Sequence, residues 1–208
     1  MTVTGAGPNF CNFSNLFARR ASRLAGVLAT VALMAACGGE PPPERPSAEV
    51  SPEKVDRAKT AAAELGKRLK SRLMETIGSE GPVAAIRVCS EEAPEIARQV
   101  SADSGLTVSR TSLKVRNPDN APDARELAVL ELWRNKIEAG TPPSALEPFA
   151  SDSDDFLWMK PIVAEPPCLM CHGSDVPEAV ADAIAARYPQ DRATGYSAGD
   201  LRGAFVVR

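Results

Sequence analysis

The sequence predicts an α+β fold in which helices come first and strands later. Residues 55–77 place apolar side chains at steps of three and four, which is the period of an amphipathic helix. Short segments rich in apolar and β-branched residues follow only further along the chain, at 106–115, 156–163 and 203–208. Helices and strands that are segregated in this way are typical of α+β proteins rather than of all-helical ones.

The first 36 residues are predicted to form a signal peptide of the lipoprotein type, outside the fold. Three arginines precede a run of 13 small and apolar residues (24–36), which is too short to span a bilayer. Small residues then precede Cys37, as in the lipobox of bacterial lipoproteins, so we expect lipidation at Cys37. Ordinary cleavage near Ala36 with an incidental Cys37, or an uncleaved anchor, are the alternatives.

The segment after Cys37 indicates where the protein resides. Gly38, rather than Asp, follows the cysteine, an arrangement that by analogy does not retain a lipoprotein at the inner membrane. We therefore expect an exported protein on the periplasmic face of a bacterial membrane, as an outer-membrane lipoprotein. Residues 37–52 are rich in proline, and we expect them to form a semi-stiff tether.

Charge excludes one class of partner. Residues 1–36 contain three arginines and no acidic residue, so the remaining chain carries 21 basic and 27 acidic residues. An acidic exported domain lacks the basic face that nucleic-acid binding needs.

The first predicted helix begins at the N-cap Ser51, which is followed by a first-turn proline, and ends at Gly78. A second helical segment begins at Gly81-Pro82 and places Val83, Ile86 and Cys89 on one face. Pro94 then enforces a break or a new helix start.

The second half of the domain alternates strands with shorter helices. After the strand at 106–115, dense turn residues lead to a capping box at Asp123 and Glu126, and the helix behind it ends at Gly140. Residues 141–155 read as a polar loop. A strand at 156–163 leads into a cysteine motif, a short helix follows at 178–187, and 203–208 form the closing strand.

The motif Cys168-Leu169-Met170-Cys171-His172 has the spacing of c-type haem attachment. Two thiols three positions apart can each form a thioether to a haem vinyl group, and the neighbouring imidazole then binds the iron from one side. The sequence therefore predicts one covalent haem c at Cys168 and Cys171, with His172 as an axial ligand.

Two other chemistries use the same residues. A Cys₃His zinc site could combine Cys89, Cys168, Cys171 and His172, but adjacent side chains converge poorly on one tetrahedral ion. A thioredoxin-like thiol pair would need a helix opening at the motif to lower a thiol pKa. Gly173 to Pro177 instead break the chain directly afterwards.

The second axial position remains open from the residues alone. His172 is the only histidine, so two histidine ligands from one chain are excluded. Met74, Met159, Cys89, water or no ligand are the candidates; Met170 is disfavoured because it lies in the attachment loop itself. For Met74, Met159 and Cys89, burial in the core is the alternative role.

Four motifs resemble those of a family of c-type haem domains with a PAS-like fold, long catalogued as a domain of unknown function and also found as a sensor module in signalling proteins. They are GPVAAIRVCSEEAPEIA, RTSLKVRNPDNAPD, CLMCHG and YPQDRATGYSAGDLRGAF, in this order within residues 53–208. The resemblance implies a central antiparallel sheet flanked by helices and preceded by a long N-terminal helix. It also implies axial ligation of the haem iron by His172 and Cys89.

These observations lead to a functional expectation. We expect a lipid-anchored periplasmic haem protein, not an enzyme, that senses redox state or a small gas ligand. One-electron transfer to a redox partner protein is the alternative. Arg110, Lys114 and Arg116 are candidates for pairing with the haem propionates, or else solvated charges; Tyr188 and Tyr196 either pack on the ring edge or anchor the last loop.

Overall fold

The computed structural model describes residues 50–152 and 155–208. The expected signal peptide, the lipidation at Cys37 and most of the tether 37–52 lie outside the described residues. Within the described part of the chain, no helix combines the length and the apolar character needed to cross a membrane.

The long first helix, α1 (Pro52–Glu80), begins where expected, with Pro52 in its first turn. It runs through Gly78 to Glu80, and Gly81 terminates it three residues later than the predicted Gly78. A glycine inside a helix costs only about 1 kcal/mol, which the rest of a long helix tolerates. Gly81 has a φ of 87°, and its N–H bonds the carbonyls of Thr76 and Ile77, each at 3.1 Å.

The next helical region consists of α2 (Pro82–Arg87), a π-helical turn η1 (Val88–Glu92) and α3 (Ala93–Ser104). Pro94 has no N–H to donate to the preceding turn, and the chain ahead of it widens into η1, where the N–H of Ala93 bonds the carbonyl of Val88. The expected shared face is wrong in part. Ile86 is buried and Cys89 is half-buried, whereas Val83 in the first turn of α2 is exposed.

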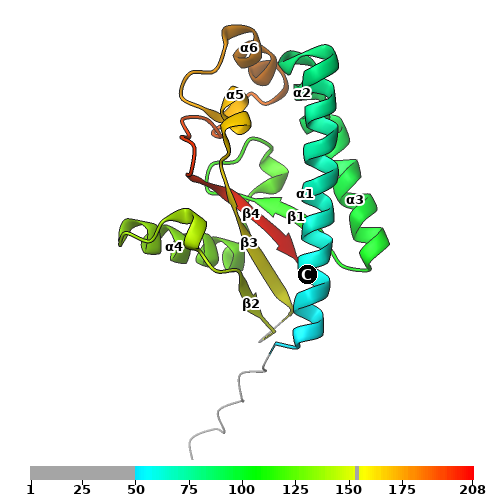
Figure 1. Ribbon diagram of the computed structural model, residues 1–208, viewed down its shortest axis with the longest axis vertical. Helices are drawn as coiled ribbons and strands as arrows, with labels where there is room; N and C mark the ends of the chain where they lie inside the picture. Colours follow the sequence, from blue (N-terminus) through cyan, green and yellow to red (C-terminus); the bar gives the residue numbers. More distant parts are fainter. Residues whose placement is uncertain (1–49, 153–154) are drawn as a thin grey trace, which may run out of the picture. The chain divides into compact units, whose positions relative to one another are not determined.

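Four strands form one antiparallel sheet in the order β1-β4-β3-β2 (Figure 1). Their bounds are β1 (Val108–Thr111), β2 (Phe149–Ser151), β3 (Leu157–Val163) and β4 (Leu201–Val207). The C-terminal strand is therefore central, pairing Val207 with both Val108 and Trp158. The short edge strand β2 falls inside the predicted polar loop, and β1 is shorter than the expected segment.

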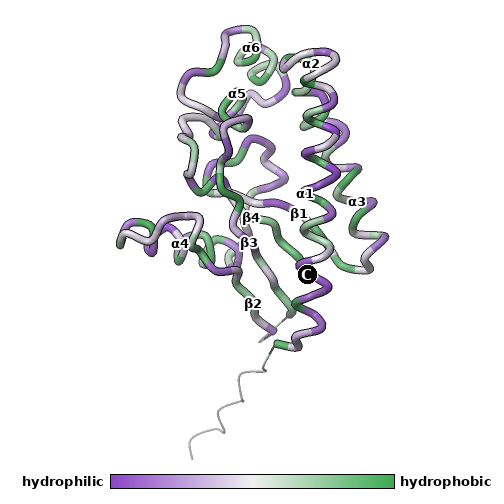
Figure 2. Tube along the Cα trace, viewed as in Figure 1, coloured by the Kyte–Doolittle hydropathy of each residue, from purple (hydrophilic) through white to green (hydrophobic). Residues whose placement is uncertain are grey.

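Helices cover both faces of the sheet. One hydrophobic core joins α1 and α3 to the sheet and includes Leu65, Val100 and Trp158. Figure 2 shows hydrophobic and hydrophilic residues alternating along α1, as expected for a helix with one buried face. A second core joins α4 (Ala124–Glu138) to the sheet through Leu130 and Trp133. The predicted α+β class, with a central antiparallel sheet, flanking helices and a long first helix, is confirmed.

A third cluster closes one end of the domain. It packs Ile86 from α2 against Val180, Ile184 and Tyr188 in and just after α6 (Glu178–Arg187), whose bounds match the prediction. Between β3 and α6 lies the cysteine motif, in a 3₁₀ turn, η4 (Pro166–Cys168), and a single turn, α5 (Leu169–His172). This end of the sheet carries the candidate site.

Candidate functional site

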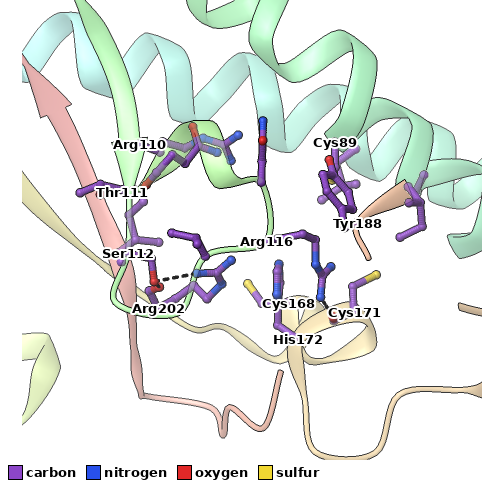
Figure 3. Close-up of a pocket in the computed structure, with 18 of the residues that line it drawn as sticks. Cys89, Arg110, Thr111, Ser112, Arg116, Cys168, Cys171, His172, Tyr188 and Arg202 are labelled. Atoms are coloured by element: carbon purple, nitrogen blue, oxygen red, sulfur yellow. Dashed lines mark hydrogen bonds between the residues drawn. The ribbon is translucent and has the colours of Figure 1, made fainter. Parts of the chain in front are cut away.

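A cavity of about 250 Å³ lies between η1, the ends of β1 and β4, and the cysteine motif (Figure 3). Its walls include Cys89, Cys168, Cys171 and His172, which are up to 83 positions apart in sequence. Apolar side chains such as Leu73, Ile77 and Ile162 complete part of the lining. An apolar cavity with a few convergent polar groups is the usual form of a cofactor site.

The cysteine motif presents its side chains to the cavity from one turn. Because α5 has helical geometry, Cys168 and Cys171 lie on nearly the same side of the chain. Figure 3 shows the two sulfur atoms on either side of the His172 imidazole. Cys89, Cys168 and Cys171 form no disulfide. Gly173 ends the turn, and a side chain there would place its Cβ 2.6 Å from the carbonyl oxygen of Leu169.

The orientation of the His172 ring leaves one nitrogen available. Nδ1 lies 2.7 Å from the carbonyl oxygen of Ala193, and because a carbonyl only accepts, Nδ1 carries the proton and donates. Nε2 therefore keeps a free lone pair, the arrangement typical of a metal-ligating histidine. Burial, reinforced by the charges of Arg202 and Arg116, lowers the pKa of His172 to about 3. The ring of Tyr196 packs edge-on against it, with centroids 6.4 Å apart.

Arg116 stabilises the wall of the cavity that contains His172. It is 7% exposed and forms a buried ion pair with Asp191, with two N–O distances of 3.1 Å. Its Nη2 also donates to the carbonyl of Cys171 at 2.6 Å and to that of Ala193 at 3.4 Å. Asp191 in turn accepts the N–H of Ala193 at 2.9 Å. The carbonyl that orients His172 is thus held by a buried charged pair, which the sequence did not reveal.

Cys89 approaches from another wall, next to Tyr188 (Figure 3). It lies in the π-helical turn η1, a distortion that is frequent at functional sites. Burial raises the pKa of the Cys89 thiol, and the guanidinium of Arg110 opposes this increase more than any other group. Tyr188 is buried beside Cys89 and lines the cavity, whereas Tyr196 packs behind His172.

The cationic groups differ from those expected. Arg110 lines the cavity, but Arg116 is neutralised by Asp191, and Lys114 donates to the carbonyl of Thr194 at 2.8 Å, outside the lining. Arg202 was missed. Its position near the end of YPQDRATGYSAGDLRGAF was the only available signal, and β4 brings it to the cavity.

The donor set fits a c-type haem. Two thiols flank an imidazole with a free Nε2, a third thiol enters from another wall, and the buried Nε of Arg202 lacks a hydrogen-bond partner. Buried polar atoms are almost always paired, so this orphan donor points to an anionic group that completes the site.

In the described residues, Met74 and Met159 lie outside the cavity lining, Met74 exposed and Met159 in the core of the sheet.

The other two chemistries fit less well. Within residues 50–152 and 155–208, no cluster of three or more His, Cys, Asp or Glu side chains is arranged to hold a metal ion. The Cys₃His zinc arrangement is therefore not assembled. Burial raises rather than lowers the pKa of Cys171, the opposite of an activated thiol pair.

Comparisons with known proteins agree with this description. A family model named Tll0287-like matches residues 43–208. Among solved structures, the crystal structure of the cyanobacterial heme-protein Tll0287 is similar, with a TM-score of 0.58 and 26% sequence identity. The match covers 76% of this chain and 95% of that one. No curated protein sequence matches this chain.

Proposed function

This chain belongs to the Tll0287-like family, and from that premise we propose that it is a c-type haem protein that senses redox state or a small ligand. In this proposal one haem is attached through Cys168 and Cys171, and its iron is held by His172 and Cys89. The observation that carries the proposal is the cavity itself, which gathers these four residues on its walls. A bound haem would supply one-electron redox chemistry and, when an axial position opens, a site for a small ligand.

His172 acts as the constant ligand in this proposal. The hydrogen bond from Nδ1–H to Ala193 orients the ring and increases the electron density at Nε2. The depressed pKa of His172 keeps Nε2 unprotonated at neutral pH, so no proton competes with the iron there.

Cys89 acts as the variable ligand. Burial favours its neutral thiol, so the thiolate depends on nearby positive charge, which a ferric iron would supply. When that positive charge decreases, protonation of Sγ becomes favourable and the ligand is weakened. Such a residue couples the charge of its surroundings to its own position.

The connection from Cys89 to α1 favours sensing over electron transfer. Glu92, in the same π-helical turn, accepts from Arg72 of α1 at 2.6 Å and from Arg87 at 2.7 Å. A displacement of η1 would therefore be transmitted to the 29-residue helix α1. Electron transfer remains the second candidate. If His172 and Cys89 both held the iron, no position would be open for a substrate, so we propose no enzymatic activity.

We further propose the cellular setting that the N-terminal sequence predicts. Export by the signal peptide 1–36, lipidation of Cys37 and a tether over 37–52 would hold the domain at the periplasmic face of the outer membrane. Labelling with a radioactive fatty acid in cells tests this. Incorporation into the wild type that is lost in Cys37→Ser is the expected result, and equal labelling of both would contradict it.

Absorption spectra of the domain, co-expressed with cytochrome maturation factors, test the haem proposal. We expect haem that survives denaturing electrophoresis in the wild type and is lost from it in Cys168→Ser/Cys171→Ser. We also expect a thiolate-type ferric spectrum that Cys89→Ala abolishes and Ser90→Ala keeps. A wild type without a Soret band would overturn the haem proposal.

The reduced protein separates the two functions. Binding of carbon monoxide by the dithionite-reduced wild type, but not by the ferric form, is expected for a sensor that releases Cys89. A reduced protein that binds no carbon monoxide, while Cys89→Ala binds it readily, would instead support electron transfer with both ligands retained.

A further inference from the structure

We propose that Arg110 and Arg202 form a subsite for two carboxylates at the strand end of the cavity, and that it holds the two propionate groups of the haem inside the protein. The inference rests on the proposed function for the identity of the ligand. The inference concerns residues outside the cysteine motif. It assigns the propionates to Arg110 and Arg202 rather than to Lys114 and Arg116.

Arg202 is a hydrogen-bond donor with unused capacity. Its Nη1 donates to Ser112 Oγ at 3.1 Å and to the carbonyl of Lys114 at 3.4 Å, so the guanidinium is held in place from behind. Its Nε is buried and has no partner, and the residue lines the cavity. An unpaired buried donor is costly, whereas a carboxylate accepting from it forms a strong charge-assisted bond.

Arg110 provides the second cation. Among the described residues, its side chain makes no hydrogen bond and no salt bridge, although the residue is half-buried and lines the cavity. Within the described part of the chain, only the ionised forms of Cys89 and Tyr188 would attract it, and burial raises the pKa of both groups. A half-buried charge without a partner is unfavourable, so a ligand anion at this position would stabilise the fold.

The charges of the cavity balance with two carboxylates. The lining contains three arginines and neither Asp nor Glu. Asp191 neutralises Arg116, which leaves the charges of Arg110 and Arg202 uncompensated. Because a haem carries two propionates, its peripheral charge matches this excess. A neutral ligand would leave both guanidinium groups unpaired, and a ligand with a single carboxylate would leave one of them unpaired.

The positions of the groups agree with the shape of a haem. Figure 3 shows Arg110 and Arg202 projecting into the cavity from the strand side, while Cys168 and Cys171 come from α5. In a porphyrin, the vinyl groups that react with cysteines and the propionates lie on different edges of the ring. The arginine subsite and the cysteines can therefore serve the two edges separately.

The test compares the holoprotein with Arg110→Gln, Arg202→Gln and the matched control Lys114→Gln. Each replacement removes one positive charge, but Lys114 lies outside the cavity lining. Two quantities are measured: the ratio of ferrous to ferric haem at a fixed applied potential, and the propionate bending bands in the resonance Raman spectrum. Circular dichroism verifies the fold of each variant.

We expect the ferrous-to-ferric ratio to fall about tenfold in each arginine variant, which is a midpoint lower by about 59 mV, because an uncompensated carboxylate favours ferric iron. The propionate bands shift in these variants. Lys114→Gln is expected to leave the bands in place and to change the ferrous-to-ferric ratio by no more than about twofold. A folded arginine variant that is not loaded with haem also supports the subsite. If a Gln variant does not fold, Arg110→Lys and Arg202→Lys keep the charge and are expected to shift the bands only.

Three results would overturn the subsite. Unchanged propionate bands in both arginine variants would show that the carboxylates lie elsewhere. A midpoint that rises in Arg110→Gln would assign Arg110 to the Cys89 thiolate instead. If Lys114→Gln changed the ferrous-to-ferric ratio and the propionate bands more than Arg202→Gln does, Lys114 rather than Arg202 would be the propionate partner. A wild type without covalent haem refutes the proposed function itself, which is a different outcome from these three.

Discussion

On one wall of the cavity, formed by η4, α5 and the loop 188–200, His172 is held by backbone hydrogen bonds and the buried Arg116–Asp191 pair. On the opposite wall, formed by η1, Cys89 lies in a π-helical turn whose ion pairs are partly exposed. We call these the His172 wall and the Cys89 wall.

The two walls differ in how easily they can be displaced: the His172 wall is held more firmly than the Cys89 wall. The chain around His172 is joined to the last loop by Tyr196 N–H to His172 O and Gly195 N–H to Gly173 O, both at 3.0 Å. Displacing it breaks several buried interactions at once. The Cys89 wall loses mainly partly exposed ion pairs, each of which contributes little. A fixed residue facing a movable one is the arrangement that the proposed ligand-release sensor needs.

The largest expected effect comes from removing the charge partner inside the His172 wall. Asp191→Ala leaves Arg116 buried without a counter-charge and is expected to destabilise the protein by about 3–5 kcal/mol. The control Glu91→Ala breaks the half-exposed pair with Arg187 on the Cys89 wall, with an expected loss below about 1 kcal/mol. Urea unfolding measures both; equal losses would contradict the comparison.

The next effect is the pH dependence of the haem-free protein. Because burial lowers the pKa of His172 to about 3, the unfolded chain binds a proton that the folded protein excludes, and stability falls as the pH decreases from about 6.5 towards 3. The expected loss is roughly 3 kcal/mol between pH 7 and pH 4, at about 1.4 kcal/mol per pH unit.

The Cys89 wall should respond at the other end of the pH range. The raised pKa of the Cys89 thiol means that the folded protein keeps a proton that the unfolded chain releases, so stability falls above about pH 9. Unfolding curves across pH are compared for the wild type, His172→Gln and Cys89→Ala. An acid loss that persists unchanged in His172→Gln would refute the assignment.

A smaller effect is expected at the end of α5. Gly173→Ala would bring a Cβ within 2.6 Å of a backbone oxygen, which cannot give way as a flexible side chain can, at an expected cost of about 1–3 kcal/mol. The control Gly78→Ala, in α1, has nothing within 4 Å and should stabilise by about 0.5–1 kcal/mol. Thermal unfolding of both variants checks the opposite signs.

The smallest change in stability, yet a clear change in ligand binding, is expected on the Cys89 wall. Glu92→Gln weakens the pairs with Arg72 and Arg87 and should cost about 1 kcal/mol or less. By loosening η1 it should increase the rate of carbon monoxide binding to the reduced protein. Glu95→Gln, which loses an exposed pair with Arg98, is the control and should leave that rate unchanged. If carbon monoxide bound at the same rate to both variants, the ion pairs of η1 would have no role in the release of Cys89.

Several features could be predicted because their signals are local. The cysteine motif is contiguous, and the helix 178–187 and the strand at 156–163 carry their own periodicity or composition. The capping box was half correct: Asp123 accepts from the N–H of Glu126, but the Glu126 side chain pairs with Arg208 at 2.8 Å. The side chain of Glu126 binds the distant Arg208 instead of the backbone N–H of Asp123. A contact between residues so far apart cannot be seen in a short stretch of sequence.

The order of helices and strands, the CxxCH motif and the single histidine could be predicted from the chain, because each depends on residues that are close along it. The folded structure was needed to show that the last strand is central, that Asp191 neutralises Arg116, and that Arg202 rather than Lys114 lines the cavity. These depend on contacts between segments up to 99 residues apart, such as Val108 and Val207. Periodicity shows which side of an element is buried but not which distant element covers it, so the electrostatics of the site became visible only in the fold.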